Sequence, residues 1–322
     1  MSNILVFGGS GFIGSHLVRR LTQAGHRVAV YDNFHPAAGS SPLLAEVQAQ
    51  RIEAVRAMAP IVEGDIRDAE RVRAAVAETR PELAVFLPSL LASESRNNPD
   101  TAVDIHVTGL IHCLRALADQ PVRRFVYTSS SFAYGDFLTD PVKEDHPRVP
   151  IDVYGRTKLI GEELTVIACQ QAKREHVIMR PAAVYGYGDS RGRLIDFMIR
   201  RALANEPILL WDPEGRADYT FVDDAADGFF RALFADGAAN QAFNLTRGRA
   251  RTNLEAAEIV CRALPGAVIE RVADDKERRV PKRGNMDVSH GKRCMGYDPT
   301  VDLEEGIPRV IEQYRRRALF SL

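Results

Sequence analysis

Residues 4–14 read ILVFGGSGFIG, and the fold can be inferred outward from this stretch. Its first four residues form a continuous apolar run, typical of a buried strand, and residues 15–24 have helical periodicity that ends at Gly25. Between them, Gly9, Gly11 and Gly14 match the pattern G-x-G-x-x-G. Glycines at this spacing permit a tight turn, close approach of the backbone to a pyrophosphate, and close packing of helix on strand. The sequence therefore predicts a strand, a phosphate-binding turn and a helix.

A second apolar run completes a dinucleotide site. Residues 27–31 predict a strand that ends at Asp32, about 20 residues beyond the last glycine, where a carboxylate accepts hydrogen bonds from ribose hydroxyls. Asp32 favours NAD over NADP, because a ribose 2′-phosphate would meet this carboxylate with like charge. A glycine turn with an incidental aspartate is the weaker alternative. The candidate cofactor contacts in this region are Gly8, Gly11, Phe12, Ile13, Gly14, Asp32 and Asn33.

Strands and helices alternate along the residues that follow. The predicted strands are 61–66, 83–87 and 125–128, and the predicted helices are 43–58, 70–78 and 101–118. This alternation predicts an α/β fold with a doubly wound, Rossmann-like parallel sheet covered on both faces. Asp65, Ile66 and Leu87 lie at the ends of strands, so we expect them beside the cofactor at the carboxyl edge. For Asp65, capping the next helix is an equal alternative.

The composition changes after residue 179. Helix 154–169 and strand 177–179 continue the alternation, but Pro181, Gly186 and Gly192 then interrupt it. The later elements are short, at 194–203, 208–211, 219–222, 225–233 and 242–245. We predict an NAD-binding domain over residues 1–179 and a smaller substrate-binding lobe over 180–322, and leave open that some segments of the lobe return to the sheet. The groove between them is the expected substrate site.

The composition is that of an ordinary globular chain. It has 322 residues, 45% of them hydrophobic, and a formal net charge of -1. Lys and Arg are dispersed, and the densest runs, 276–279 and 315–317, are typical of solvated faces, so no nucleic-acid partner is expected. No stretch approaches the roughly 20 apolar residues of a membrane span, and no targeting pattern is present. The four cysteines lack metal-ligand spacing, so we predict buried thiols, no metal and a cytoplasmic location.

Tyr154 and Lys158 are candidate catalytic residues. They are four residues apart on the predicted helix 154–169, and therefore on one face about one turn apart. An ammonium at this distance can bias the ionisation of a phenol, whose pKa is otherwise about 10. Tyr154 is thus a possible acid/base, considered together with the run TSSS at 128–131. The same spacing arises by chance on exposed helix faces, so the other motifs must support it.

Several motifs, in order along nearly the whole chain, resemble the extended short-chain dehydrogenases/reductases, and most closely their NAD-dependent sugar-nucleotide epimerase/dehydratase branch. The motifs are residues 8–14, Asp32, 64–66, 129–131, Tyr154 with Lys158, 180–186, 219–223 and 303–306. The resemblance implies that Tyr154 is the acid/base and that Ser130 hydrogen-bonds the reacting hydroxyl. It also implies that Lys158 holds the nicotinamide ribose and lowers the pKa of the phenol. Ser93 and Ser131 are further expected substrate contacts.

Departures from the family pattern favour some reactions over others. The family's 4,6-dehydratases have an Asp-Glu pair after the Ser/Thr, and its decarboxylases have a Glu at the second of these positions. This chain has Ser131 and Phe132 there, and neither can perform that proton transfer. Dehydration and decarboxylation are therefore disfavoured. Oxidation to a ketone remains, with the hydride either returned to the opposite face or released with the cofactor.

Other departures concern the substrate and the neighbourhood of the tyrosine. Ala183 and Ala217 replace an asparagine and an arginine that help the branch hold a nucleotide diphosphate. Either diphosphate binding is relocated or the substrate is not an ordinary sugar nucleotide. The family's usual Asn in helix 101–118 is His106, for which an interior structural role is favoured over a proton relay. The family usually has His-Leu-Ala-Ala after the fourth strand, whereas this chain has LPSL at 87–90. The candidates for relocated diphosphate binding are Arg191, Arg193, Arg216 and Arg283.

Three functions follow from these motifs. The first is an NAD-dependent epimerase of a nucleotide-diphosphate sugar, acting at C4 and keeping its cofactor bound. The second is a dehydrogenase or ketoreductase of a sugar or another secondary alcohol. A non-catalytic NAD-binding regulator is a third, disfavoured because it would not need Tyr154, Lys158 and Ser130 in register.

The resemblance also implies a homodimer. In this dimer, helices 101–118 and 154–169 of one subunit would pair with their copies in the second subunit as a four-helix bundle. The apolar positions of these helices fit this and intramolecular packing equally: Ile105, Leu110, Leu114, Leu159 and Ile167.

Overall fold

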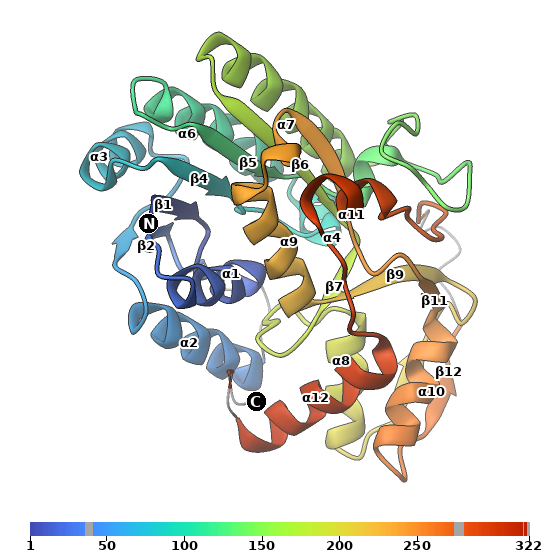
Figure 1. Ribbon diagram of the computed structural model, residues 1–322. Helices are drawn as coiled ribbons and strands as arrows, with labels where there is room; N and C mark the ends of the chain where they lie inside the picture. Colours follow the sequence, from blue (N-terminus) through green and yellow to red (C-terminus); the bar gives the residue numbers. More distant parts are fainter. Residues whose placement is uncertain (36–40, 274–279, 318, 321–322) are drawn as a thin grey trace.

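The structure of the protein is a computed structural model, which describes residues 1–35, 41–273, 280–317 and 319–320 (Figure 1). Most of the predicted loop at 35–41 and the basic run at 276–279 lie outside these residues. Within the described part of the chain, no helix is both long and apolar enough to cross a bilayer. All four cysteines are free thiols. Cys113 and Cys169 are buried as predicted, whereas Cys261 and Cys294 are only partly buried.

The centre of the molecule is a sheet of seven parallel strands in the order β10-β6-β5-β4-β1-β2-β3, so the predicted Rossmann-like fold is confirmed. The strands are β1 Asn3–Phe7, β2 Arg27–Asp32, β3 Ile61–Glu63, β4 Leu83–Phe86, β5 Arg124–Thr128, β6 Glu175–Pro181 and β10 Gln241–Leu245. Most are short, continuous apolar runs, because a parallel sheet is buried on both faces. Phe7 pairs with Tyr31 and Phe86, which brings the carboxyl ends of β1, β2 and β4 to one edge.

Helices cover both faces of this sheet (Figure 1). The helices of one face are α1 Phe12–Gln23, α2 Pro42–Arg56 and α9 Val222–Phe234, and those of the other are α3 Ala69–Thr79, α6 Gly109–Leu117 and α7 Val153–Gln171. Successive residues of β1 point to opposite faces. Ile4 and Val6 pack in the core shared with α1 and α9, and Leu5 and Phe7 pack in the core shared with α3 and α6.

The later part of the chain forms a smaller lobe with its own core. That core includes Ile199 of α8 (Leu194–Leu203), Tyr219 of β9 (Arg216–Phe221), Ile259 of α10 (Asn253–Ala263) and Val310 of α12 (Leu303–Arg316). Two of its segments belong to the central layers instead: β10 extends the sheet beside β6, and α9 packs on α1. The remaining elements of the lobe are β7 Ala183–Tyr185, α8 Leu194–Leu203, β8 Ile208–Leu210, β9 Arg216–Phe221, β11 Ala250–Thr252, α10 Asn253–Ala263, β12 Ile269–Arg271, α11 Ser289–Met295 and α12 Leu303–Arg316.

Several predicted elements have different bounds in the structure, and two of these differences have a clear physical cause. The strand predicted at 61–66 ends at Glu63, because the Asp65 carboxylate accepts a hydrogen bond from the Arg67 N–H at 2.9 Å and turns the chain. The helix predicted at 101–118 is instead α5 Pro99–Val103, a π-helical turn at Asp104–Thr108 and α6, preceded by α4 Ala92–Asn97. A π turn holds more residues than an α turn, so a search for a 3.6-residue period cannot detect it.

Candidate active site

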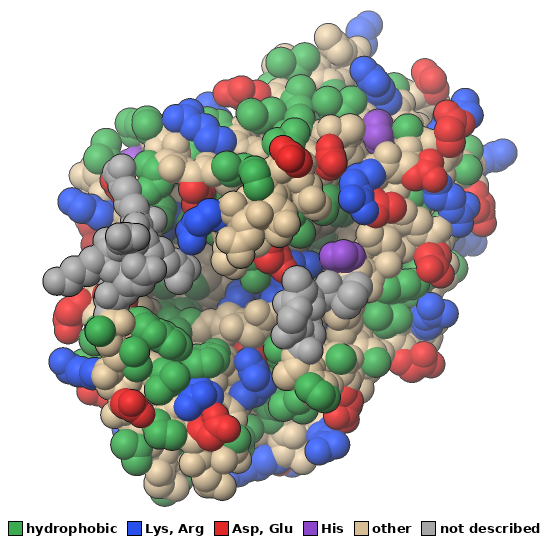
Figure 2. All heavy atoms as spheres, turned by 180° about the vertical axis from the view of Figure 1, so that it is seen from behind, with side chains coloured by type: hydrophobic (Ala, Val, Ile, Leu, Met, Phe, Trp, Pro, Cys, Tyr) green, Lys and Arg blue, Asp and Glu red, His purple; other side chains and the backbone are tan. Residues whose placement is uncertain are grey.

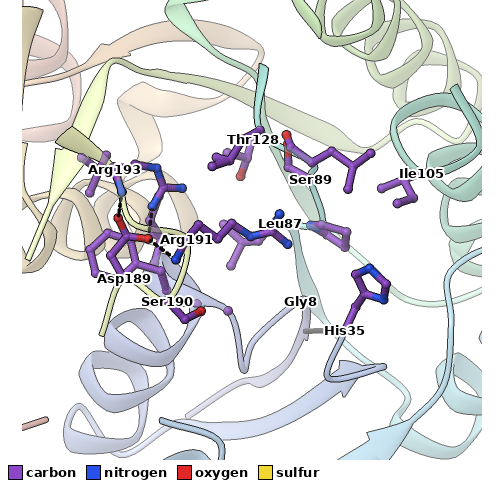
Figure 3. A pocket seen from close by; sticks show the side chains of 18 of the residues that line it. Gly8, His35, Leu87, Ser89, Ile105, Thr128, Asp189, Ser190, Arg191 and Arg193 are labelled. Atoms are coloured by element: carbon purple, nitrogen blue, oxygen red, sulfur yellow. Dashed lines mark hydrogen bonds and ion pairs between the residues drawn. The ribbon is translucent and has the colours of Figure 1, made fainter. Parts of the chain in front are cut away.

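A cavity of about 770 Å³ opens at the carboxyl edge of the central strands. Gly8, Leu87 and Thr128, which lie in or just after β1, β4 and β5, line it on one side (Figure 3). Asp189 and Arg193, from the loop before α8, line it on the other. Figure 2 shows the molecule hollowed in the middle of one face, with Lys and Arg side chains in the depth of the hollow. The cavity therefore lies between the sheet and the smaller lobe.

The glycine turn and Asp32 form the part of the cavity that suits a dinucleotide. A Cβ atom on Gly14 would overlap the carbonyl oxygen of Gly8, so the close start of α1 requires glycine. The Asp32 carboxylate accepts hydrogen bonds at 2.9 Å from the backbone N–H groups of Ser10 and Phe34. Burial raises the pKa of Asp32, and these two bonds oppose the rise. The carboxylate is therefore held in place at the end of β2.

Every residue predicted to contact the cofactor lines this cavity. The side-chain bond of Asp65 to Arg67 lowers the pKa of Asp65 to about 2. The alternative role of Asp65 as the cap of the next helix is wrong, because Asp68 caps α3 by accepting the Arg71 N–H at 3.0 Å. The contacts themselves stay predictions. The lining residues concerned are Gly8, Gly11, Phe12, Ile13, Gly14, Asp32, Asn33, Asp65, Ile66, Leu87, Tyr154 and Lys158.

Tyr154 and Lys158 lie in the first turns of α7. The helix begins after Asp152, whose carboxylate accepts a hydrogen bond from the Gly155 N–H at 2.7 Å. The Lys158 Nζ donates to the Thr128 carbonyl oxygen at 2.9 Å and lies 5.8 Å from the centre of the Tyr154 ring. Burial lowers the pKa of Lys158 to about 7. The helix is thereby tied to the end of β5.

The Tyr154 phenol is adjacent to two serines. Burial raises the pKa of Tyr154, and hydrogen bonding with the side chains of Ser130 and Ser89 opposes this rise. The Lys158 Nζ is directed at the Thr128 carbonyl oxygen, and a lowering of the Tyr154 pKa by Lys158 stays a prediction. Ser130 itself accepts the Phe132 N–H at 3.2 Å, which positions it at the start of a 3-10 turn, Ser131–Tyr134.

The predicted substrate residues fall into two groups. Ser93, Ser130, Tyr154, Arg191 and Arg193 line the cavity. Arg191 forms an ion pair with Glu94, and Arg193 forms one with Asp189 at 2.8 Å.

The other three predicted substrate residues, Ser131, Arg216 and Arg283, are not among the residues that line the cavity, and their contact with a substrate stays a prediction. Ser131 is buried in the 3-10 turn behind Ser130. Arg216 forms an ion pair with Asp140 at 2.8 Å in the smaller lobe. Arg283 donates to the Gly135 carbonyl oxygen at 2.8 Å and stacks over the Phe132 ring.

Sequence reasoning missed Arg51, a buried residue of α2 that lines the cavity. Its Nε donates to the Ser10 carbonyl oxygen at 2.6 Å, and its Nη1 donates to the Gly188 carbonyl oxygen and, at 3.2 Å, to the Ser190 hydroxyl. Arg51 therefore ties the glycine turn to the loop before α8. Burial lowers its pKa only to about 10, so it stays charged near neutral pH. No local pattern marks it, because its partners are far away in the sequence.

Comparison with known proteins identifies the family. The model of the NAD dependent epimerase/dehydratase family matches residues 4–246. The chain belongs to this family. Among curated members, UDP-glucose 4-epimerase of Mycolicibacterium smegmatis is 30% identical, over 98% of this chain and 99% of its own. UDP-glucuronic acid decarboxylase 4 of Arabidopsis thaliana is 29% identical, over 98% of this chain and 69% of its own.

A solved member of the epimerase/dehydratase family supports the architecture. The structure of UDP-glucose 4-epimerase of Thermotoga maritima with UDP-glucose aligns with a TM-score of 0.86 and 26% identity. The alignment covers 98% of this chain and 99% of that one. The similarity therefore includes the smaller lobe as well as the sheet.

Proposed function

We propose that this protein is an NAD-dependent epimerase of a nucleotide-diphosphate sugar, acting at C4 through a transient ketone. The observation that supports this most is the meeting of Tyr154, Ser130 and Lys158 at a cavity whose other end has the glycine turn and Asp32. The similarity to the Mycolicibacterium and Thermotoga epimerases over nearly the whole chain supports the substrate class.

The chemistry assigned to the protein is proton transfer and positioning. Ser130 holds the substrate hydroxyl by a hydrogen bond, and the Tyr154 phenolate takes its proton as the hydride leaves. NAD, when bound, would supply the hydride acceptor. For inversion, the ketone presents its other face before the hydride and the proton return. Lys158 of α7, which is buried beside the end of β5, is assigned to bind the cofactor ribose.

Phe132 favours epimerisation over the reactions of related enzymes. Its ring lies edge-on to Tyr154, with ring centres 5.4 Å apart, where the family's dehydratases and decarboxylases have a glutamate. A phenyl ring can neither donate nor accept the extra proton that loss of water or of carbon dioxide requires. The similarity to a plant decarboxylase therefore concerns the fold and the cofactor site.

Arg191 and Arg193 are the best candidates to hold the diphosphate in place of the residues lost at Ala183 and Ala217. Both line the cavity, and the Arg193 guanidinium lies 5.5 Å from the centre of the Phe12 ring at the start of α1. Each now pairs with a carboxylate, so binding a diphosphate would exchange these partners for phosphate oxygens. The missing family residues are also what favours the second candidate, a dehydrogenase of a different secondary alcohol.

A panel of sugar nucleotides tests the proposal. Purified protein is incubated with UDP-, GDP-, CDP- and dTDP-sugars and substoichiometric NAD, and the products are examined by NMR and mass spectrometry. We expect an isomer of unchanged mass without accumulation of NADH. NADH accumulating with an oxidised product would favour the dehydrogenase, and no isomer from any sugar would overturn the substrate class. Tyr154→Phe should abolish turnover and leave NAD binding nearly intact, since it removes one oxygen. Activity of this variant would contradict the assigned chemistry.

We also propose that the protein is a homodimer in the cytoplasm. Val103 of α5 and Val153, Ile160 and Ile167 of α7 are large apolar side chains exposed by 43%, 37%, 41% and 52%. They fit a face shared with a second copy. Leu110 does not belong to that face, because it is fully buried against the sheet.

A further inference from the structure

Two departures from the family pattern contact each other beside the catalytic tyrosine. Ser89 stands in the LPSL run where the family usually has alanine, and His106 stands where it usually has asparagine. They are 17 residues apart in sequence, yet the Ser89 Oγ and the His106 Nε2 are 3.2 Å apart. Ser89 lines the cavity, whereas His106 lies fully buried behind it. The histidine ring is edge-on to the Tyr154 ring, with centres 5.7 Å apart.

The hydrogen bonds around His106 define which of its nitrogens carries the proton. The Leu90 backbone N–H, which can only donate, lies 3.0 Å from Nε2, so Nε2 is an acceptor. The Nδ1–H therefore donates to the Thr157 hydroxyl at 2.8 Å, and that hydroxyl donates to the Tyr154 carbonyl oxygen at 3.0 Å. Burial and the nearby Lys158 charge hold the pKa of His106 well below its usual value, so it stays neutral. The ring thus links the segment carrying Ser89 to the first turn of α7.

In this arrangement the Ser89 hydroxyl can donate its proton to more than one partner. The lone pair of Nε2 already accepts the Leu90 N–H, and the Leu90 carbonyl oxygen lies 2.8 Å from the Ser89 Oγ. The Tyr154 hydroxyl is the remaining partner on the cavity side. A serine hydroxyl rotates to suit its neighbours. When Tyr154 is a phenol, Ser89 can donate to the carbonyl; when Tyr154 is a phenolate, it can donate to the phenolate oxygen.

We propose that Ser89 is a second hydrogen-bond donor to the ionised Tyr154, beside Ser130, and that His106 is the positioning residue that holds the segment carrying Ser89 by accepting the Leu90 N–H. No proton passes to Ser89 or His106: the proton of the substrate hydroxyl goes to Tyr154, and the Ser89 proton only changes direction. A donor to the phenolate offsets part of the cost of ionising a buried phenol. The inference rests on the proposed role of Tyr154 as the acid/base.

The test is a titration of Tyr154 in the NAD-bound enzyme, read from the near-ultraviolet absorbance of tyrosinate as the difference from Tyr154→Phe. In Ser89→Ala the pKa of Tyr154 should rise by about half a unit to one unit, which is the value of one neutral hydrogen bond. The rate kcat on the acidic limb should fall about three- to tenfold, with KM and NAD content unchanged. Ser89→Thr keeps the hydroxyl and should titrate like the natural protein. An unchanged titration in Ser89→Ala would overturn the proposal.

The role of His106 is tested by asking whether its substitution and that of Ser89 have independent effects on the pKa of Tyr154. His106→Asn restores the family's residue and should raise the pKa of Tyr154, while the double variant with Ser89→Ala should match Ser89→Ala alone. Additive shifts would overturn the positioning role. Thr165→Val is the control, because Thr165 lies on the same helix with a buried hydroxyl that has no partner among the described residues. Unfolding midpoints of all variants separate these effects from loss of the fold.

Apart from His106 in its own variants, the charged and titratable groups of the described residues that face the phenol are the same throughout. They are Lys158 and Asp152 of α7 and its cap, Tyr127 of β5, Arg193 before α8, and Arg283. Because the titration needs no sugar, its result is independent of the substrate panel. If the pKa of Tyr154 shifts in Ser89→Ala but the natural protein turns over no sugar nucleotide, the proposed function is overturned and the role of Ser89 as a hydrogen-bond donor is supported. If the natural protein has turnover but the pKa of Tyr154 does not shift in Ser89→Ala, only the role of Ser89 as a donor is overturned.

Discussion

At the scale of one residue, the burial of Lys158 in the site lowers the stability of the folded protein. Lys158 is 1% exposed, and among the described residues its ammonium has one hydrogen bond, to the Thr128 carbonyl oxygen. Burying a charge without a counterion is costly, which is why its pKa falls to about 7. The folded chain therefore carries a cost at this position that only its role beside the cofactor explains.

Lys158→Met should stabilise the NAD-free protein and abolish turnover. Below about pH 7 both folded and unfolded chains hold the proton, so the natural protein carries the full cost of burial. Between about pH 7 and about 10.4 only the unfolded chain binds it, so the natural protein gains stability as pH rises. We expect a gain of about 1–3 kcal/mol near pH 6 that declines towards pH 10, measured by urea unfolding. A gain independent of pH would contradict this, and the exposed Lys143→Met is the control.

The sequence predicted the residues whose role is local. The glycines, Asp32 and the Tyr154/Lys158 pair follow patterns within one turn or one βαβ unit, and the structure brings them to one cavity. Arg51 and Ser89 could not be predicted in this way. Their importance comes from partners such as Gly188 and His106, which only the folded chain brings near.

At the scale of one element, α7 is held in register by contacts along a single face. Glu162, one turn beyond Lys158, accepts the Ser129 hydroxyl at 2.5 Å and binds Arg180 through both carboxylate oxygens, at 2.8 and 2.7 Å. Gly161 lies directly against the Tyr127 hydroxyl of β5. Helical spacing predicts such a face. It does not predict how closely the helix approaches the strand, because that distance depends on the side chain opposite the glycine.

Gly161→Ala should therefore destabilise the protein, although alanine is the better helix former. The new Cβ would overlap the Tyr127 hydroxyl, and overpacking costs about 1–3 kcal/mol against a gain of about 1 kcal/mol in helix propensity. We expect a net loss of up to about 2 kcal/mol in denaturant unfolding, with lower kcat because Tyr154 shifts with the helix. Glu163→Ala, on the exposed face of α7, should change stability by less than about 0.5 kcal/mol. A more stable Gly161→Ala would show that α7 has room to move.

At the scale of the whole molecule, the exposed apolar side chains of α5 and α7 predict a second copy. Ile167→Glu places a charge in that face and should convert the dimer to a monomer in light scattering, because an unpaired charge would be buried there. Val268→Glu is the matched control, since Val268 is 62% exposed and lies just before β12, in the smaller lobe. A dimer that persists in Ile167→Glu would exclude this face as the interface.

The order of strands is a property of the whole molecule that local patterns do not contain. Apolar runs predicted most strands of the sheet, including residues 242–245, but not that this last run pairs with β6. The pairing follows from a chain that leaves the sheet after β6, builds much of the smaller lobe, and returns.

That return has a consequence for how the protein can be made and altered. Without β10, the backbone of β6 would be an open edge beside apolar residues such as Val177 and Met179. On the ribosome, the sheet stays incomplete until Leu245 has emerged, long after the first six strands. A recombination break at residue 179 would likewise remove a structural strand together with the lobe. Exchange of the whole lobe would therefore disrupt the central sheet, whereas changes confined to the loops of the lobe would leave its seven strands intact.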